Sequence, residues 1–205
     1  MMKATWSIAT AAAALLLAAG SAGAQVCAGF PAAEGGGTVG GLANFPSGYE
    51  QYGVQGDYNS EGPIAFNGGI LGAFDNGSSL FTLRGGVAFK LDSIARVHGL
   101  SLCPNLRVDF SSRSGFTLWQ VPIGFGIGAT LPLGEGGTAL TPYVIPALVW
   151  QQLSGGTGNS VSESDFGLRG GTDLNFGRFY LGGTAEWVQA TGTKVMFGIR
   201  GGAKF

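Results

Sequence analysis

Apolar and polar residues alternate along most of the chain with a period of two, which is the repeat of an extended strand. The alternation predicts ten strands, near residues 37–45, 49–58, 63–74, 79–91, 101–111, 116–131, 138–152, 164–175, 178–190 and 193–205. No segment keeps a helical repeat, because glycine is scattered through all of them and each glycine costs a helix roughly 1 kcal/mol relative to alanine. We therefore expect an all-β protein.

Turn-forming sequences separate most of these segments. Asp75-Asn76-Gly77 and Gly134-Glu135-Gly136-Gly137 supply the positive φ angles that tight hairpins need. Two connections are longer, near 92–100 and 154–163. The first two strands and the seventh are the least regular, and the seventh carries Pro142 and Pro146, which a central strand tolerates poorly.

The two faces of these strands differ in side-chain size, and this difference indicates the environment of the fold. A soluble sandwich would also alternate, with its apolar face turned inward. Here the polar face mixes charges with glycine and other small residues, while bulky aromatics occupy the apolar face and lie near strand ends. This arrangement is typical of the aromatic girdles of a transmembrane barrel, and most segments reach the roughly 9–11 residues that a spanning strand needs.

The N-terminal residues indicate export. Lys3, the apolar stretch AAAALLLAAG and the small residues Ala22-Gly23-Ala24 are typical of a secretory signal peptide, which we assign to residues 1–24. Residues 25–36 are then an expected periplasmic tail, and residues 37–205 the barrel. No later apolar run reaches the length of a membrane-spanning helix. The net charge of -1 argues against nucleic acid as a partner.

The segment KVMFGIRGGAKF places Phe197, Ile199 and Phe205 on one face of a strand. With the signal peptide and the alternating strands, it makes the mature chain similar to small bacterial outer-membrane β-barrel proteins. The resemblance implies a closed antiparallel up-and-down transmembrane β-barrel of about ten strands, with eight as the alternative. It also implies a location in the bacterial outer membrane, contact with its lipid, and recognition of Phe197, Ile199 and Phe205 by the barrel-assembly machinery. It leaves the oligomeric state open.

If the apolar face meets lipid, the charged residues face the lumen. In so narrow a barrel a nearly balanced set of charges should pair with one another and fill the lumen. We expect such a network to include Arg84, Arg107, Asp109, Arg169, Asp173, Glu186 and Arg200. Arg178 falls on the same face of its segment. Four glycine pairs recur at similar depth and are interpreted as curvature sites: Gly85-Gly86, Gly170-Gly171, Gly182-Gly183 and Gly201-Gly202.

Candidate chemistry is sparse. Cys27 and Cys103 are the only cysteines, and an even count in an exported chain predicts one structural disulfide between them. The only histidine, His98, lies in a predicted connection without a nucleophile and base beside it, so we expect no catalysis. No residue spacing indicates a metal or cofactor site.

Three functions remain open at this point. The first is an integral outer-membrane barrel with a structural or surface-interaction role and a lumen filled by charges. The second is a small solute pore or transporter. The third is a soluble secreted β-barrel or sandwich that binds an apolar ligand, which would leave the membrane without detergent.

Overall fold

The computed structural model describes residues 36–46, 49–75, 78–91, 100–134, 137–155, 159–189 and 195–205. Within these ranges the chain forms eleven strands and no helix that could cross a membrane. The strands are β1 (Gly36–Phe45), β2 (Gln51–Asn59), β3 (Ile64–Asp75), β4 (Ser78–Phe89), β5 (Leu100–Arg113), β6 (Phe116–Ala129), β7 (Leu131–Pro132), β8 (Thr138–Gly155), β9 (Ser160–Phe176), β10 (Phe179–Val188) and β11 (Met196–Lys204).

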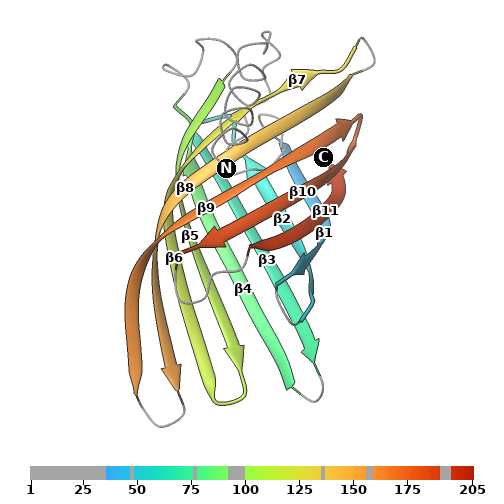
Figure 1. Ribbon diagram of the computed structural model, residues 1–205. Helices are drawn as coiled ribbons and strands as arrows, with labels where there is room; N and C mark the ends of the chain where they lie inside the picture. Colours follow the sequence, from blue (N-terminus) through green and yellow to red (C-terminus); the bar gives the residue numbers. More distant parts are fainter. Residues whose placement is uncertain are drawn as a thin grey trace, which may run out of the picture.

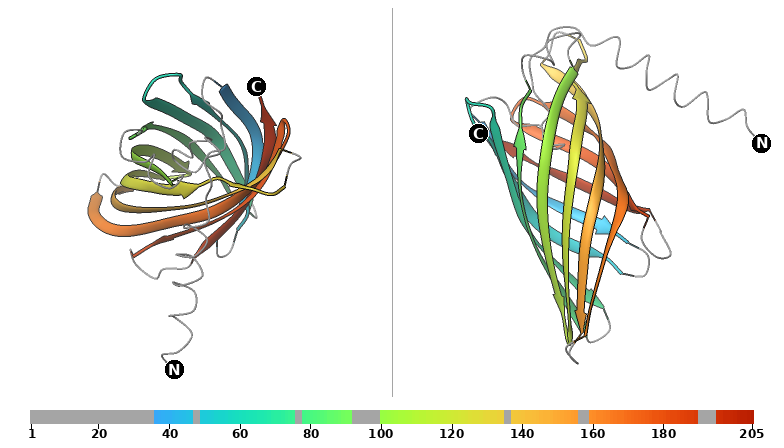
Figure 2. Two further views of the ribbon diagram at one scale, coloured as in Figure 1. Left: turned by 90° about the horizontal axis from the view of Figure 1, so that it is seen from above. Right: turned by 90° about the vertical axis from the view of Figure 1, so that its left-hand side faces the viewer.

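Ten of the described strands close into one antiparallel barrel. Each strand pairs with its neighbour in sequence, β6 pairs with β8, and β1 pairs with β11 to complete the ring (Figures 1 and 2). The short strand β7 continues the course of β6 and adds two pairs to β8. The prediction of an up-and-down barrel of ten strands is confirmed, and the alternative of eight strands is wrong.

The two ends of the barrel differ. At one end, here called the terminal end, β1 begins and β11 finishes. At the opposite end, the far end, the hairpins β3–β4, β5–β6 and β8–β9 project well beyond the short strands β1, β2, β10 and β11 (Figures 1 and 2). The predicted loop at 154–163 is wrong in its bounds, because β8 and β9 remain paired out to Ser154 and Ser160.

Prolines are accommodated where one ladder of their strand is interrupted. The β6–β8 pairs run from Gly124↔Ala147 to Ile127↔Val144, and the gap between them contains Pro146. Pro142 lies in the next gap, between the β6 and β7 partners of β8, yet it keeps its pairing with β9. Because proline lacks only the amide hydrogen, it fits a strand that gives up a backbone hydrogen bond on one side. β8 is therefore the longest strand although it contains both prolines.

Side-chain polarity is inverted relative to a soluble protein. The exposed large side chains are mostly apolar and point out of the barrel, whereas most of the buried polar side chains point into it. Exposed aromatics form two belts on the outer surface. Phe89, Phe179 and Phe205 belong to the belt at the terminal end, and Phe81 and Trp119 to the belt toward the far end.

The spacing of the belts fits a bilayer. Phe81 and Phe89 are eight residues apart on β4, which is about 26 Å along a strand at roughly 3.3 Å per residue. At the tilt of roughly 35–45° typical of membrane barrels, this length spans about 19–22 Å along the bilayer normal, slightly less than the roughly 25 Å band that such barrels present to lipid.

Candidate functional site in the barrel lumen

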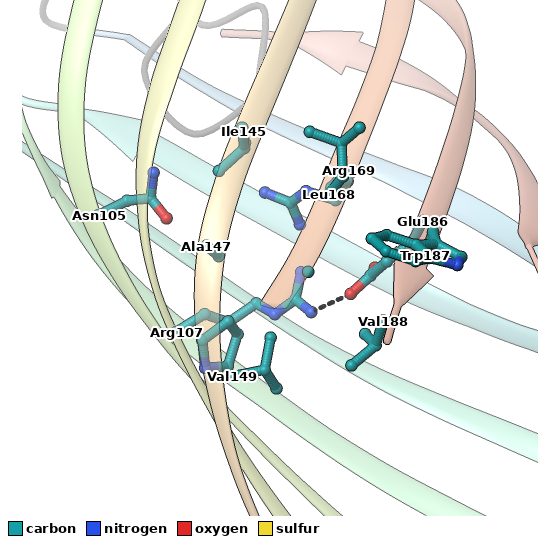
Figure 3. A pocket seen from close by; sticks show the side chains of 12 residues that line it. Asn105, Arg107, Ile145, Ala147, Val149, Leu168, Arg169, Glu186, Trp187 and Val188 are labelled. Atoms are coloured by element: carbon teal, nitrogen blue, oxygen red, sulfur yellow. Dashed lines mark hydrogen bonds and ion pairs between the residues drawn. The ribbon is translucent and has the colours of Figure 1, made fainter. Parts of the chain in front are cut away.

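A chain of ion pairs crosses the middle of the lumen. Arg84 Nε donates to Asp109 Oδ1 at 3.0 Å, and Arg107 Nε lies 3.0 Å from Asp109 Oδ2. Arg107 Nη2 then donates to Glu186 Oε1 at 2.7 Å (Figure 3). Arg107 is on β5 and Glu186 on β10, and these strands share no ladder, so this last bond joins opposite walls of the barrel.

Arg169 lies beside this bridge. In the β9–β10 register Arg169 is directly opposite Glu186, so Glu186 has one arginine next to it and another across the lumen. Ile145, Ala147 and Val149 of β8 form an apolar wall next to the same group (Figure 3). The wall reduces the water around the bridge, which strengthens the attraction between the charges and also raises the cost of removing one of them.

A second ion pair lies nearer the terminal end. Arg200 donates from Nε to Asp173 Oδ1 at 2.8 Å and from Nη2 to Oδ2 at 2.5 Å, which is the two-pronged geometry that arginine and carboxylate favour. The Arg200 guanidinium carbon also lies 5.2 Å from the centre of the Tyr143 ring. Asp173 is wholly buried, and Arg200 is nearly so.

Gly182 makes the second pair possible. Its register partners are Asp173 on β9 and Arg200 on β11, so the two side chains meet directly over it. A Cβ atom at Gly182 would lie 1.9 Å from Asp173 Oδ1, whereas one at Gly183 would meet nothing within 4 Å. Gly182, which faces the lumen, therefore allows the ion pair to pack closely against its strand. The sequence interpretation of Gly182-Gly183 as a curvature site did not include this role.

This contrast gives a matched test. Gly182→Ala should separate Asp173 from Arg200 and lower the free energy of unfolding by about 2 kcal/mol or more, in the range of overpacking and broken buried pairs. Gly183→Ala, one residue away on the outer face, should change it by less than about 0.5 kcal/mol. Urea unfolding in lipid vesicles, followed by tryptophan fluorescence, measures both. Equal effects of the two variants would contradict the packing role of Gly182.

All seven charged residues expected in the lumen lie on inward-facing positions. Six of them are joined in the pairs described above, and Arg169 lies alongside them. The prediction that Arg178 faces the lumen is wrong. Arg178 is exposed in the turn between β9 and β10, where its carbonyl accepts a hydrogen bond from the Lys204 amide. The turn leaves the strand geometry on which the alternation depends.

Several uncharged inward side chains were left out of the predicted lumen network. Thr38 Oγ1 donates to Asp57 Oδ1, and Gln120 Nε2 donates to Gln151 Oε1 at 3.0 Å. Tyr143 packs against Arg200. Each stands at the inward position of its strand, so the period-two pattern would have located these residues had uncharged polar side chains been counted with the charged ones.

Phe197, Ile199 and Phe205 all lie on the outer face, with the Phe205 side chain 77% exposed. Phe205 also belongs to the seam between the first and last strands. Its amide donates to the Gly37 carbonyl at 3.0 Å, and its carbonyl accepts from the Gly37 amide at 2.9 Å. A Cβ atom on Gly37 would lie 2.6 Å from the Phe205 ring, so the ring rests against this glycine. Recognition of Phe197, Ile199 and Phe205 by the barrel-assembly machinery stays a prediction.

The remaining expectations concern cysteine, histidine and metal chemistry. Cys103 is buried against Ala65 and Ala88, while Cys27 lies outside the described residues, so their disulfide stays a prediction. His98 also lies outside the described residues. In the part of the chain that the structure covers, His, Cys, Asp and Glu side chains form no group of three or more that could hold a metal ion.

An apolar belt outside and ion pairs inside decide the architecture. The fold is that of a small transmembrane β-barrel. No protein-family model matches the chain, and no curated protein matches it. Among solved structures, the N-terminal β-barrel domain of Pseudomonas aeruginosa OprF is 12% identical, with a TM-score of 0.42, over 84% of this chain and 98% of that one.

A second similar structure is Ail, the attachment invasion locus protein of Yersinia pestis, in complex with the heparin analogue sucrose octasulfate. It is 14% identical, with a TM-score of 0.34, over 84% of this chain and 99% of that one. At these values the assignment of the fold rests on the strand order and side-chain polarity of this barrel itself.

Proposed function

We propose that the protein is an integral outer-membrane β-barrel with a structural or surface-interaction role, exported by residues 1–24 and closed in the lumen by its ion pairs. The observation that carries the proposal is the inverted polarity, with aromatic and aliphatic side chains outside and charged side chains inside. Lipid stabilises such an outer surface, and a closed barrel has no unpaired sheet edge within the bilayer. The terminal end then faces the periplasm, and the far end faces outward.

The arrangement of the lumen favours this role over conduction. The Arg107–Glu186 bond spans the lumen, and the buried Arg200–Asp173 pair occupies a second level nearer the terminal end. Breaking either pair to admit an ion would leave a buried charge without its partner, which costs several kcal/mol. We therefore propose a barrel that is closed at rest and has no catalytic role, with Cys27 and Cys103 joined at the periplasmic end.

Membrane extraction and conductance test this proposal together. The protein should stay with outer membranes in urea and dissolve only in detergent, and its electrophoretic mobility should shift on boiling. In planar bilayers the folded protein should give no stepwise conductance. Release without detergent would support the soluble alternative and overturn the proposal, whereas regular conductance steps would support the pore.

A further inference from the structure

The polarity of the barrel wall reverses beyond the far-end aromatic belt. Across β4, β5 and β6 the belt row is Leu83, Phe110 and Trp119. The next outward row toward the far end begins with Phe81 of the belt on β4 and continues from β5 to β9 with hydroxyl-bearing residues: Ser112, Thr117, Ser154 and Ser160. The outer surface of the hairpins β5–β6 and β8–β9 is therefore suited to water or lipid head groups at this level.

On β6, β8 and β9 the inward face at the same level is apolar. Leu118, Leu153 and Val161 are direct cross-strand neighbours on β6, β8 and β9, and Phe116 follows one row further out against Gly155. These four residues are here called the far-end wall. Phe116 is 57% exposed, Leu153 48% and Val161 66%. An apolar surface turned toward the axis, where lipid does not reach, indicates a binding face.

The far-end wall borders a cavity of roughly 290 Å³ in the outer part of the lumen. Phe116, Leu118 and Leu153 line one side of it. Arg84, Asp109 and Glu186 line the cavity from the level of the central ion pairs, and Gln51, Thr82, Ser111 and Gln120 supply amide and hydroxyl groups. A concave site that combines an apolar wall with a few convergent polar groups is the usual form of a small-molecule pocket, and its volume is at the small end of the usual range of roughly 300–1,000 Å³.

The charges around the cavity select the class of ligand. Arg84 and Arg113 balance Asp109 and Glu186, and the Arg84–Asp109 and Arg107–Glu186 pairs already neutralise the charges at the centre of the barrel. A charged ligand would have to compete with these internal pairs. The amide and hydroxyl groups, in contrast, can donate and accept hydrogen bonds with an uncharged partner.

We propose that this cavity binds a small uncharged amphiphile, with a polyhydroxyl head group against the amide and hydroxyl lining and a short hydrocarbon chain against the far-end wall. The inference rests on the proposed function, since it requires the far end to face outward, and it gives the surface-interaction role a ligand class. The head group sits deeper than the chain, because Gln120 lies one inward position deeper on β6 than Leu118 of the far-end wall, and Arg84 and Asp109 lie at the level of the central ion pairs.

The test uses hexyl β-D-glucoside titrated onto the full protein in lipid nanodiscs, with empty nanodiscs as the reference, by isothermal titration calorimetry. We expect saturable binding in excess of the empty discs. Glucose alone should bind at least about tenfold more weakly, since burying a few methylenes contributes more than about 1.4 kcal/mol. 1-Hexanol alone should also bind more weakly, because it lacks the hydroxyl groups that hydrogen-bond to the polar lining. Binding of glucose equal to that of the glucoside would overturn the role of the wall.

Leu153→Gln is the informative variant, and Ser154→Gln is its matched control one residue away on the opposite face. Leu153→Gln should weaken binding by about tenfold, because the amide cannot bury apolar surface against the hydrocarbon chain, and Ser154→Gln should leave binding unchanged. No saturable binding, or equal effects of the two variants, would overturn the proposal. The shift in electrophoretic mobility on boiling shows whether each sample is a folded barrel. If a folded barrel does not bind the glucoside, this inference is wrong and the proposed function still stands.

Discussion

Phe205→Ser should remove most of the folded, heat-modifiable form of the protein from the outer membrane of cells. The variant keeps the two backbone hydrogen bonds between residue 205 and Gly37 and removes only the ring, which is 77% exposed on the outer face. If assembly depends on that ring, as the resemblance to outer-membrane barrels implies, insertion should fail although the folded state loses little packing. A gel of boiled and unboiled outer-membrane fractions measures the loss.

The control for this result is Phe179→Ser, which removes another exposed outward aromatic at the terminal end but leaves the β1–β11 seam intact. It should insert nearly as well as the parent. Purified Phe205→Ser protein should also refold in lipid vesicles without assistance. Failure to refold there would mean that the ring stabilises the seam itself, and normal insertion in cells would reject the assembly role.

Asp173→Asn should lower the free energy of unfolding by about 3–5 kcal/mol, the usual cost of removing one partner of a buried ion pair. Asp173 is wholly buried and holds both prongs of Arg200, so the variant leaves a cation in the lumen without the carboxylate that it now contacts. An asparagine cannot supply the missing charge. Urea unfolding in lipid vesicles gives the change directly.

The double variant Asp173→Asn with Arg200→Met should recover much of this loss, because neither charge is then left buried alone. Arg178→Gln, in the exposed turn, should change the stability by less than about 0.5 kcal/mol. A double variant as unstable as Asp173→Asn would show that the unpaired charge of Arg200 is not the cause of the lost stability.

Much of the fold follows from local sequence. Side chains alternate along every strand, so the ten segments, their outward aromatics and the inward position of Arg84 or Glu186 could be predicted without a structure. The bounds near Ser160 could not, because the Gly/Ser-rich stretch there looks like a loop until its pairing with β8 is seen. Similarly, Pro146 weakens a strand in isolation, and only the gap in the β6–β8 ladder explains why it is tolerated.

Not all of the ion pairs could be predicted without knowing how the barrel closes. Arg84 and Asp109 are register partners on adjacent strands, and a hairpin model of β4 and β5 would have suggested that pair. Arg107 and Glu186 are 79 positions apart and meet only because the sheet curls until β5 faces β10. The far-end wall was missed for another reason. The sequence interpretation assumed that one face stays polar along a whole strand, whereas the polarity changes sides beyond Trp119.

The seam between β1 and β11 has a consequence for the order of folding. Within the described strands, the other pairings of the ring join neighbours in sequence, whereas Thr38↔Lys204 and the rest of the seam join segments more than 150 residues apart. Loop-closure entropy makes such a contact the slowest to form. The chain can therefore grow as an open, curling sheet with two unpaired edges, which are prone to aggregation until they meet. Closure is then the committing step, and its rate sets how long those edges stay exposed.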